Sequence, residues 1–172
     1  GTNLESSISY IQSVGLNAKD VMSDVANNMD MMNKFNFADG VQGLTKMAAQ
    51  ASMLRFDMQN TANFADKVMS PEAAIEAAAG FQRLGISIGN LSDPFALMNE
   101  SINDPGALQD SIIKATKQFT EFDEKTQSFR INPQGVLTLR ELQAETGLSA
   151  AELSKAAIAA ADLDKRLSAI SP

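Results

Sequence analysis

Three prolines, each preceded by a serine or an aspartate, divide the middle of this chain into helices. The pairs are Ser70-Pro71, Asp93-Pro94 and Asp104-Pro105. Proline suits the first position of a helix, where its missing N–H needs no partner, and the side chain before it accepts hydrogen bonds from the first free N–H groups. We therefore predict helices that begin at Pro71, Pro94 and Pro105.

Apolar residues at helical spacing predict further helices before the first of these prolines. The face of a first helix holds Leu4, Ile8 and Ile11. A second helix is expected from about Lys19, and its apolar stripe consists of Val21, Val25, Met29 and Met32. Two more helices are expected over residues 41–54 and 58–69. Because polar positions are few in residues 41–54, we expect that helix to lie centrally.

The second half of the chain has one strand signal between helices. Thr120 and Phe122, then Phe129 and Ile131, alternate across residues 124–127, which predicts a β-hairpin. Glycine suits the left-handed conformation after a helix, so the helix from Pro71 is expected to end at Gly85, and residues 86–90 are expected to be a short connector. After residues 132–135, helices are expected over 136–145 and 149–170.

We therefore predict a mainly α fold, an irregular bundle of seven or eight helices with one small β-hairpin near residues 119–131. The chain of 172 residues is long enough to bury a core. We expect a single helical domain over 1–172, with a possible division into a methionine-rich part, 1–118, and a part with the hairpin and a helical hairpin, 119–172. The first residues have neither an initiator methionine nor a signal peptide, so we interpret the chain as a piece excised from a longer one.

The last predicted helix has an apolar seam with alternating spacings of three and four residues. The seam consists of Leu153, Ala156, Ala160, Leu163, Leu167 and Ile170. Such a seam is typical of a coiled coil when it persists over several heptads, and of a long amphipathic helix packed on its own domain when it is shorter. Both interpretations stay open, and the seam is our candidate surface for helix packing or oligomerisation.

The composition excludes several classes of function. The chain has no histidine, cysteine or tryptophan, which removes Ser-His-Asp and Cys-His catalysis, disulfides and His- or Cys-held metals. Its net charge is −7, and its basic residues form pairs rather than a stripe, so nucleic-acid specificity is not expected. Apolar runs are too short to cross a membrane. We expect no enzyme, no cofactor and no metal.

Acidic and glycine-rich stretches do not change this expectation. The carboxylates of residues 121–124 lack the spacing of a calcium loop, and we interpret the acidic clusters as caps, solvated faces and hairpin turns. No glycine pattern forms a phosphate cradle. The nine methionines lie between Met22 and Met98. Their helical spacing favours core packing, with an adaptable binding surface as the alternative.

Residues 139–155 resemble a helix-turn-helix, with a glycine in the turn. DNA readout needs long polar side chains at the start of the second helix. Ser149, Ala150, Ala151 and Glu152 stand there instead. We therefore favour a helical hairpin that serves as scaffold, and keep a DNA binder as an alternative.

Five strings, spread over residues 17–170, resemble an internal segment of bacteriophage tail tape measure proteins. They are NMDMMNKFNF at 28–37, GVQGLTKMA at 40–48, AGFQRLG at 79–85, NDPGALQ at 103–109 and AADLDKRL at 160–167. Such a family is long and mostly helical, lies within the tail tube and sets tail length during assembly. The resemblance carries over no catalytic or binding residue.

The resemblance implies a structural, non-enzymatic component of the virion tail that is made in the host cytoplasm. Its partners would be further copies of itself and other tail proteins. Because proline and glycine interrupt the helices, we expect a compact insert between rod-like segments, with residues 4–14 and 153–170 leading out. A helical adaptor domain for protein–protein interaction, using the methionines or the terminal seam, is the alternative.

Overall fold

The computed structural model describes residues 17–30, 34–37, 40–86 and 91–170, which form eight helices and one two-stranded hairpin. The elements are α2 (Ala18–Asn27), α4 (Val41–Met53), α5 (Gln59–Lys67), α6 (Pro71–Arg83), α7 (Pro94–Asn103), α8 (Pro105–Lys117), β1 (Thr120–Asp123), β2 (Ser128–Ile131), α9 (Pro133–Thr146) and α10 (Ala150–Ile170). The predicted mainly helical fold with one hairpin is confirmed.

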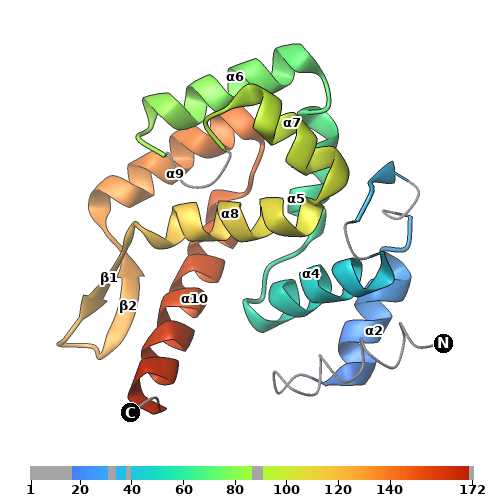
Figure 1. Ribbon diagram of the computed structural model, residues 1–172. Coiled ribbons are helices and arrows are strands. Elements are labelled where there is room, and N and C mark those ends of the chain that lie inside the picture. Colours follow the sequence, from blue (N-terminus) through green and yellow to red (C-terminus); the bar gives the residue numbers. More distant parts are fainter. Residues whose placement is uncertain (1–16, 31–33, 38–39, 87–90, 171–172) are drawn as a thin grey trace.

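Helix α8 crosses the middle of the molecule, and the other elements are arranged around it (Figure 1). Helices α6, α7 and α9 lie on one side of it, and α2 and α4 lie on the other. Helix α10 packs on α8, on α9 and on the hairpin. From there it runs on toward the C-terminus between the hairpin and α4 (Figure 1).

Helices α6, α7 and α8 begin at Pro71, Pro94 and Pro105, as predicted from the three prolines. Asp93 Oδ1 accepts from the N–H of Phe95 at 3.0 Å, and Asp104 Oδ1 accepts from the N–H of Ala107 at 3.1 Å. Ser70 precedes α6 in extended conformation, but its side chain makes no capping hydrogen bond. The expected cap at Ser70 is therefore wrong, although the proline alone suffices to start the helix there.

A fourth helix uses the same device, at Asn132 and Pro133. The Asn132 side chain accepts from the N–H of Gly135 at 2.6 Å, and α9 begins at Pro133 rather than at the predicted Val136. A Cβ on Gly135 would lie 2.6 Å from Phe119 Cβ and 2.9 Å from Ile131 Cγ2. Glycine therefore lets the first turn of α9 pack directly against the end of the hairpin.

The hairpin matches the predicted alternation in register. Thr120 pairs with Ile131 and Phe122 pairs with Phe129, in antiparallel orientation. The rings of Phe122 and Phe129 meet edge to face at 5.1 Å, a geometry that aromatic pairs prefer. This face of the hairpin packs on α10.

The core is built from leucine, isoleucine, phenylalanine and many alanines. Phe64 of α5 and Phe81 of α6 are buried and meet edge to face at 6.0 Å. The largest fully buried side chains are those of Phe64, Phe81, Leu44, Met47, Ile86, Leu91, Leu97, Leu108, Ile112, Leu139 and Leu142. Alanine lets the short helices approach closely, and α4 contributes Ala48, Ala49 and Ala51 to the same core.

The methionine stripe expected on the second helix is only half formed. Helix α2 buries Val21 and Val25 but ends at Asn27, and Met29 lies in the following turn with 42% of its surface exposed. Elsewhere the methionines divide: Met47 and Met58 are buried, whereas Met53 is part-buried. The prediction that the methionines pack in the core therefore holds for Met47 and Met58 but not for Met29.

Three predictions fall on residues outside the described part. They are the helix carrying Leu4, Ile8 and Ile11, the position of Met32 and the connector after Ile86.

Candidate functional site

The seam of α10 is divided between the core and the surface. Leu153 and Ala156 are 0% exposed and belong to the core. Ala160 and Leu163 are part-buried, and Leu167 is 54% exposed. Ile170 is the last residue of the helix, beyond the side chains that the structure describes. The predicted surface is therefore confined to the outer half of the seam, from Ala160 onward.

A groove of about 510 Å³ lies beside this outer half, between α4, α8 and α10. We call it the α4–α8 groove. Its apolar lining comes from all three helices and consists of Met47, Met53, Leu54, Ala107, Ile113, Ala160 and Leu163. Charged residues also line it, and they are Lys46, Asp104, Asp110, Lys114, Lys117 and Asp164. Its size falls in the range of natural binding sites.

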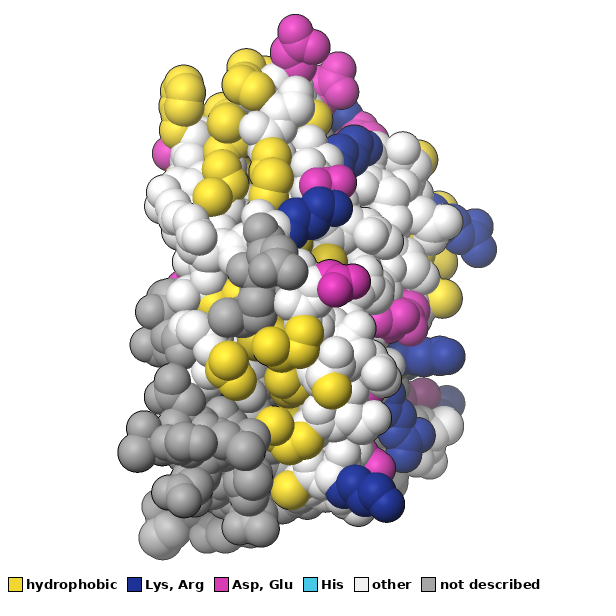
Figure 2. Space-filling model, turned by 90° about the vertical axis from the view of Figure 1, so that its right-hand side faces the viewer, with side chains coloured by type: hydrophobic (Ala, Val, Ile, Leu, Met, Phe, Trp, Pro, Cys, Tyr) yellow, Lys and Arg dark blue, Asp and Glu magenta, His cyan; other side chains and the backbone are white. Residues whose placement is uncertain are grey.

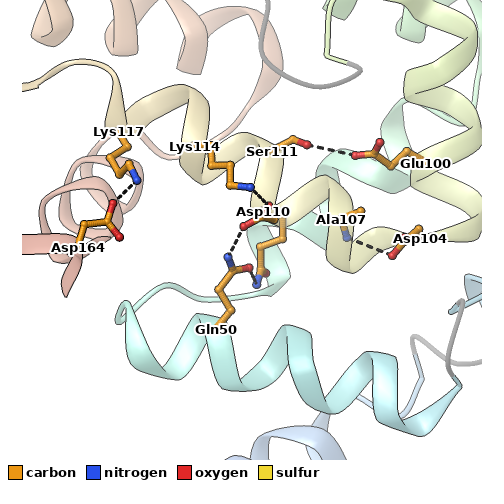
Figure 3. A network of polar contacts seen from close by, with 10 residues as sticks. Gln50, Glu100, Asp104, Ala107, Asp110, Ser111, Lys114, Lys117 and Asp164 are labelled. Carbon is orange, nitrogen blue, oxygen red and sulfur yellow. Dashed lines mark hydrogen bonds and ion pairs between the residues drawn. The ribbon is translucent and has the colours of Figure 1, made fainter. Parts of the chain in front are cut away.

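A chain of hydrogen bonds runs from the core to the edge of this groove, and Figure 3 shows its outer part, from Gln50 to Asp110. Gln109 is 0% exposed, accepts from Thr61 Oγ1 at 3.1 Å and donates to Gln50 Oε1 at 3.1 Å. It also donates to the backbone oxygen of Met47 at 2.9 Å. Gln50 Nε2 in turn donates to Asp110 Oδ1 at 3.0 Å. The chain thus joins α5, α8 and α4, and satisfies the buried amide.

Four of the charged residues at the groove form two ion pairs. Lys114 Nζ lies 2.8 Å from Asp110 Oδ2, one turn earlier on α8. This hydrogen bond, together with the charge of Asp110, raises the pKa of Lys114 above its ordinary value. Lys117 forms an ion pair with Asp164 of α10. The Lys117–Asp164 pair joins α8 to α10 along one wall of the groove, whereas the Asp110–Lys114 pair lies within α8 (Figure 3).

The opposite side of the outer α10 contacts the hairpin. The Lys165 ammonium lies over the Phe122 ring, 3.1 Å from its centroid, which is a cation–π contact. A second groove, of about 720 Å³, runs between the hairpin, α10 and the end of α4, and Leu163 lines both grooves. The outer seam is therefore flanked by two hollows rather than covered.

The acidic clusters noted in the sequence have structural partners. Arg130 on β2 lies 2.8 Å from Glu121 and 3.7 Å from Asp123, both on β1. Asp162 pairs with Arg166 at 2.8 Å. Among the described residues, no group of three or more His, Cys, Asp or Glu side chains is placed to hold a metal ion.

The helical hairpin of α9 and α10 turns at Gly147, which has φ of +79°. At the start of α10 the Glu152 carboxylate accepts from the N–H of Asp57 at 3.2 Å and from the Asn60 side chain. The end that would enter a DNA groove thus packs against the start of α5. This contact supports the interpretation of the hairpin as scaffold.

The face shown in Figure 2 mixes positive and negative side chains, and hydrophobic side chains gather between them in separate groups. No continuous basic area is visible among the described residues on that face. Within the described part of the chain, none of the helices has both the length and the apolar character needed to span a membrane.

Gln50, Gln109 and Thr61, which form the chain of hydrogen bonds, were not predicted from the sequence. A signal for Gln109 was present, since it lies on the face of α8 that holds Ile112 and Ile113, where an apolar residue is expected. Gln50 carries the same signal, since its neighbours on α4 are largely apolar.

The chain matches no protein-family model, and neither a curated protein nor a solved structure is significantly similar to it.

Proposed function

We propose that this chain is a structural segment of a bacteriophage tail tape measure protein, located in the virion tail and acting by helix packing and self-association rather than by catalysis. The observation that carries the self-association is the outer seam of α10. Leu163 and Leu167 continue a core stripe onto the surface, where Leu167 is 54% exposed. The tail assignment is supported by the resemblance of the five strings.

The structure also refines how the segment would join its neighbours. The whole of residues 153–170 was expected to lead out of the compact part, but Leu153 and Ala156 are buried within it. In the proposed role, only the outer half of α10 is available to other copies or to other tail proteins. A partner would bury Leu167 and gain the hydrophobic free energy of that side chain.

Sedimentation of the purified chain over a range of concentrations tests self-association. We expect wild type to associate and Leu167→Asp to remain monomeric, because a buried unpaired carboxylate is strongly unfavourable. Leu137→Asp is the matched control: Leu137 is 62% exposed on α9, away from the seam. A monomeric wild type, or equal effects of the two substitutions, contradicts the proposal.

The tail assignment has a separate test. An antibody raised against residues 17–170 should detect, in purified virions, a polypeptide many hundreds of residues long. Detection of a short cellular protein that is absent from virions would reject the phage role and favour the adaptor alternative.

A further inference from the structure

Helices α2 and α4, with the described residues between them, form a unit that we call the N-terminal arm; the rest of the molecule is the body. Helix α2 packs mainly on α4, and α4 packs on α8. In Figure 1 the pair lies together at one end of the molecule, beside α8. The described residues that follow α2 also belong to the interface with the body: Lys34 pairs with Asp66 of α5 at 3.3 Å, and Asn28 accepts from the Gln59 side chain.

That interface is rich in hydrogen bonds. Gln109 of α8 binds the Met47 carbonyl and the Gln50 side chain, and Gln50 binds Asp110. A second tie lies after α2, where Asn36 donates from its backbone to the Ile102 oxygen at 2.7 Å and from its side chain to Asn103 at 3.2 Å. Every one of these bonds would form equally well if arm and body came from different copies.

The segment that connects the arm to the body is held in an unfavourable backbone conformation. At the end of α4, Phe56 N–H donates to the Ala51 oxygen at 2.8 Å and Arg55 N–H donates to the Ser52 oxygen at 3.3 Å. This is the Schellman pattern, in which the left-handed residue is usually glycine. Here it is Arg55, with φ of +56°.

Among the described residues, two other helices end with a glycine in the left-handed region. Gly85 after α6 has φ of +78° and Gly147 after α9 has φ of +79°. A residue with a Cβ in this region is disfavoured by roughly five- to thirtyfold relative to one in a right-handed or extended conformation. The closed arm therefore keeps a strain that an extended connector would release.

We propose that the N-terminal arm is exchangeable between two copies of this chain, which gives a domain-swapped dimer. In this dimer the chain opens at Arg55, which leaves the left-handed region, while Leu54 stays buried with the arm and Phe56 with the body. Helix α4 of one copy then packs on α8 of the other. The native interface is re-formed without new contacts, which makes swapping a low-cost route to dimers. The exchange is independent of the α10 seam and of the proposed tail function.

The absence of cysteine from the sequence allows a direct test with full-length chains. Two single-cysteine variants, Gln50→Cys and Asp110→Cys, are each made together with Leu167→Asp, which removes the seam. They are mixed, unfolded, refolded at high concentration and treated with a short bismaleimide. We expect a covalent heterodimer on a denaturing gel, since residues 50 and 110 are neighbours only across the arm–body interface.

A second pair, Asn36→Cys mixed with Asn103→Cys, repeats the test at the other tie, in case the first pair folds poorly. As a control, Glu121→Cys and Arg130→Cys lie on paired strands of the hairpin. Placed in one chain they should cross-link within that chain, and placed in separate chains they should not cross-link. Absence of a heterodimer from both arm pairs, with the hairpin control working, overturns the exchange.

Substitutions at Arg55 test whether its backbone strain favours the exchange of the arm. Arg55→Gly relieves the strain in the closed arm, so we expect the swapped fraction to fall. The dimerisation constant should weaken by about 25-fold or more, because the fivefold lower limit applies to each of the two connectors in a dimer. Arg55→Val should raise the swapped fraction, because a β-branched residue fits the left-handed region poorly. Gly85→Ala strains a similar turn within the body, where an added Cβ meets nothing within 4 Å, and should leave the swapped fraction unchanged. Equal effects at positions 55 and 85 would refute the role of the connector.

Discussion

The inner and outer halves of α10 carry the same apolar spacing in different surroundings. In the inner half, Leu153 and Ala156 lie in the core beneath α8 and α9. In the outer half, Leu163 lies between two grooves and Leu167 is exposed. The inner half therefore stabilises this chain, whereas the outer half is available to bind another one.

This difference arises from what packs beside each half. The inner half is enclosed because the start of α10 is held by Glu152 to Asp57 and Asn60 at the beginning of α5. Among the described residues, the outer half is flanked by Lys117 of α8 and by Phe122 of the hairpin, and a groove lies on each side of Leu163. The same heptad spacing thus gives buried residues in one half of the helix and exposed residues in the other, depending on which elements pack beside it.

The largest difference in stability between the two halves is expected when Leu153 and Leu167 are each replaced by alanine. Leu153→Ala leaves a cavity in the core and should lower the free energy of unfolding by about 2–5 kcal/mol. Leu167→Ala removes an exposed side chain and should change it by less than about 0.5 kcal/mol. Chemical denaturation at a concentration where both variants are monomeric measures this, and similar losses would show that the two halves are not distinct.

Enlarging the two alanines should locate the boundary between the halves. Ala156→Leu forces extra volume into a site that is 0% exposed and should destabilise the fold by about 1–3 kcal/mol. Ala160→Leu adds the same volume at the edge of the α4–α8 groove, which has room for it. Thermal unfolding compares the pair, and an equal loss at Ala160 would place the boundary further along the helix.

A smaller effect is expected from removing the aromatic support of the outer half. Phe122→Ala deletes the contact with Lys165 and the edge-to-face pair with Phe129, which together contribute about 1–2 kcal/mol. Hydrogen exchange should increase in the outer half of α10 and stay unchanged at its inner half. Uniform exchange along the helix would indicate that the hairpin does not support the outer half separately.

The smallest effect is a pH dependence at the groove beside the outer half. Because the folded pKa of Lys114 is raised above its ordinary value of 10.5, its contribution is complete below that value and is lost as the pH rises through the raised pKa. An exposed pair one helical turn apart contributes only about 0.3–0.5 kcal/mol. The difference in stability between wild type and Lys114→Met should therefore be constant near neutral pH and vanish in strong alkali; a constant difference throughout would contradict the assignment.

Local rules predicted much of the fold. Asp93 and Asp104 were expected to cap helices, and Phe122 and Phe129 were expected to lie in a hairpin, because a cap or an alternation depends on a few neighbouring residues. The same rules misplaced the start of α9, since Asn132 and Pro133 were interpreted as an interruption. They also extended α2 through Met29, because an apolar residue at helical spacing does not by itself continue a helix.

Local rules predicted less of the candidate site. The seam residues were identifiable from spacing, but the division between Ala156 and Ala160 depends on helices distant in the chain. The chain from Thr61 through Gln109 to Gln50 joins residues 48 and 59 positions apart. A polar residue on the apolar face of α8 marks Gln109, but no spacing in the sequence indicates which distant residues it contacts.

By itself, the sequence determined the helices, their proline starts, the hairpin and the absence of histidine and cysteine chemistry, because backbone conformation and side-chain chemistry are local properties. The tertiary structure alone decided which half of the α10 stripe is buried, which polar side chains meet, and that Arg55 takes a left-handed conformation. Burial depends on the area that other elements remove from water, and a strained backbone persists only where the surrounding packing holds it.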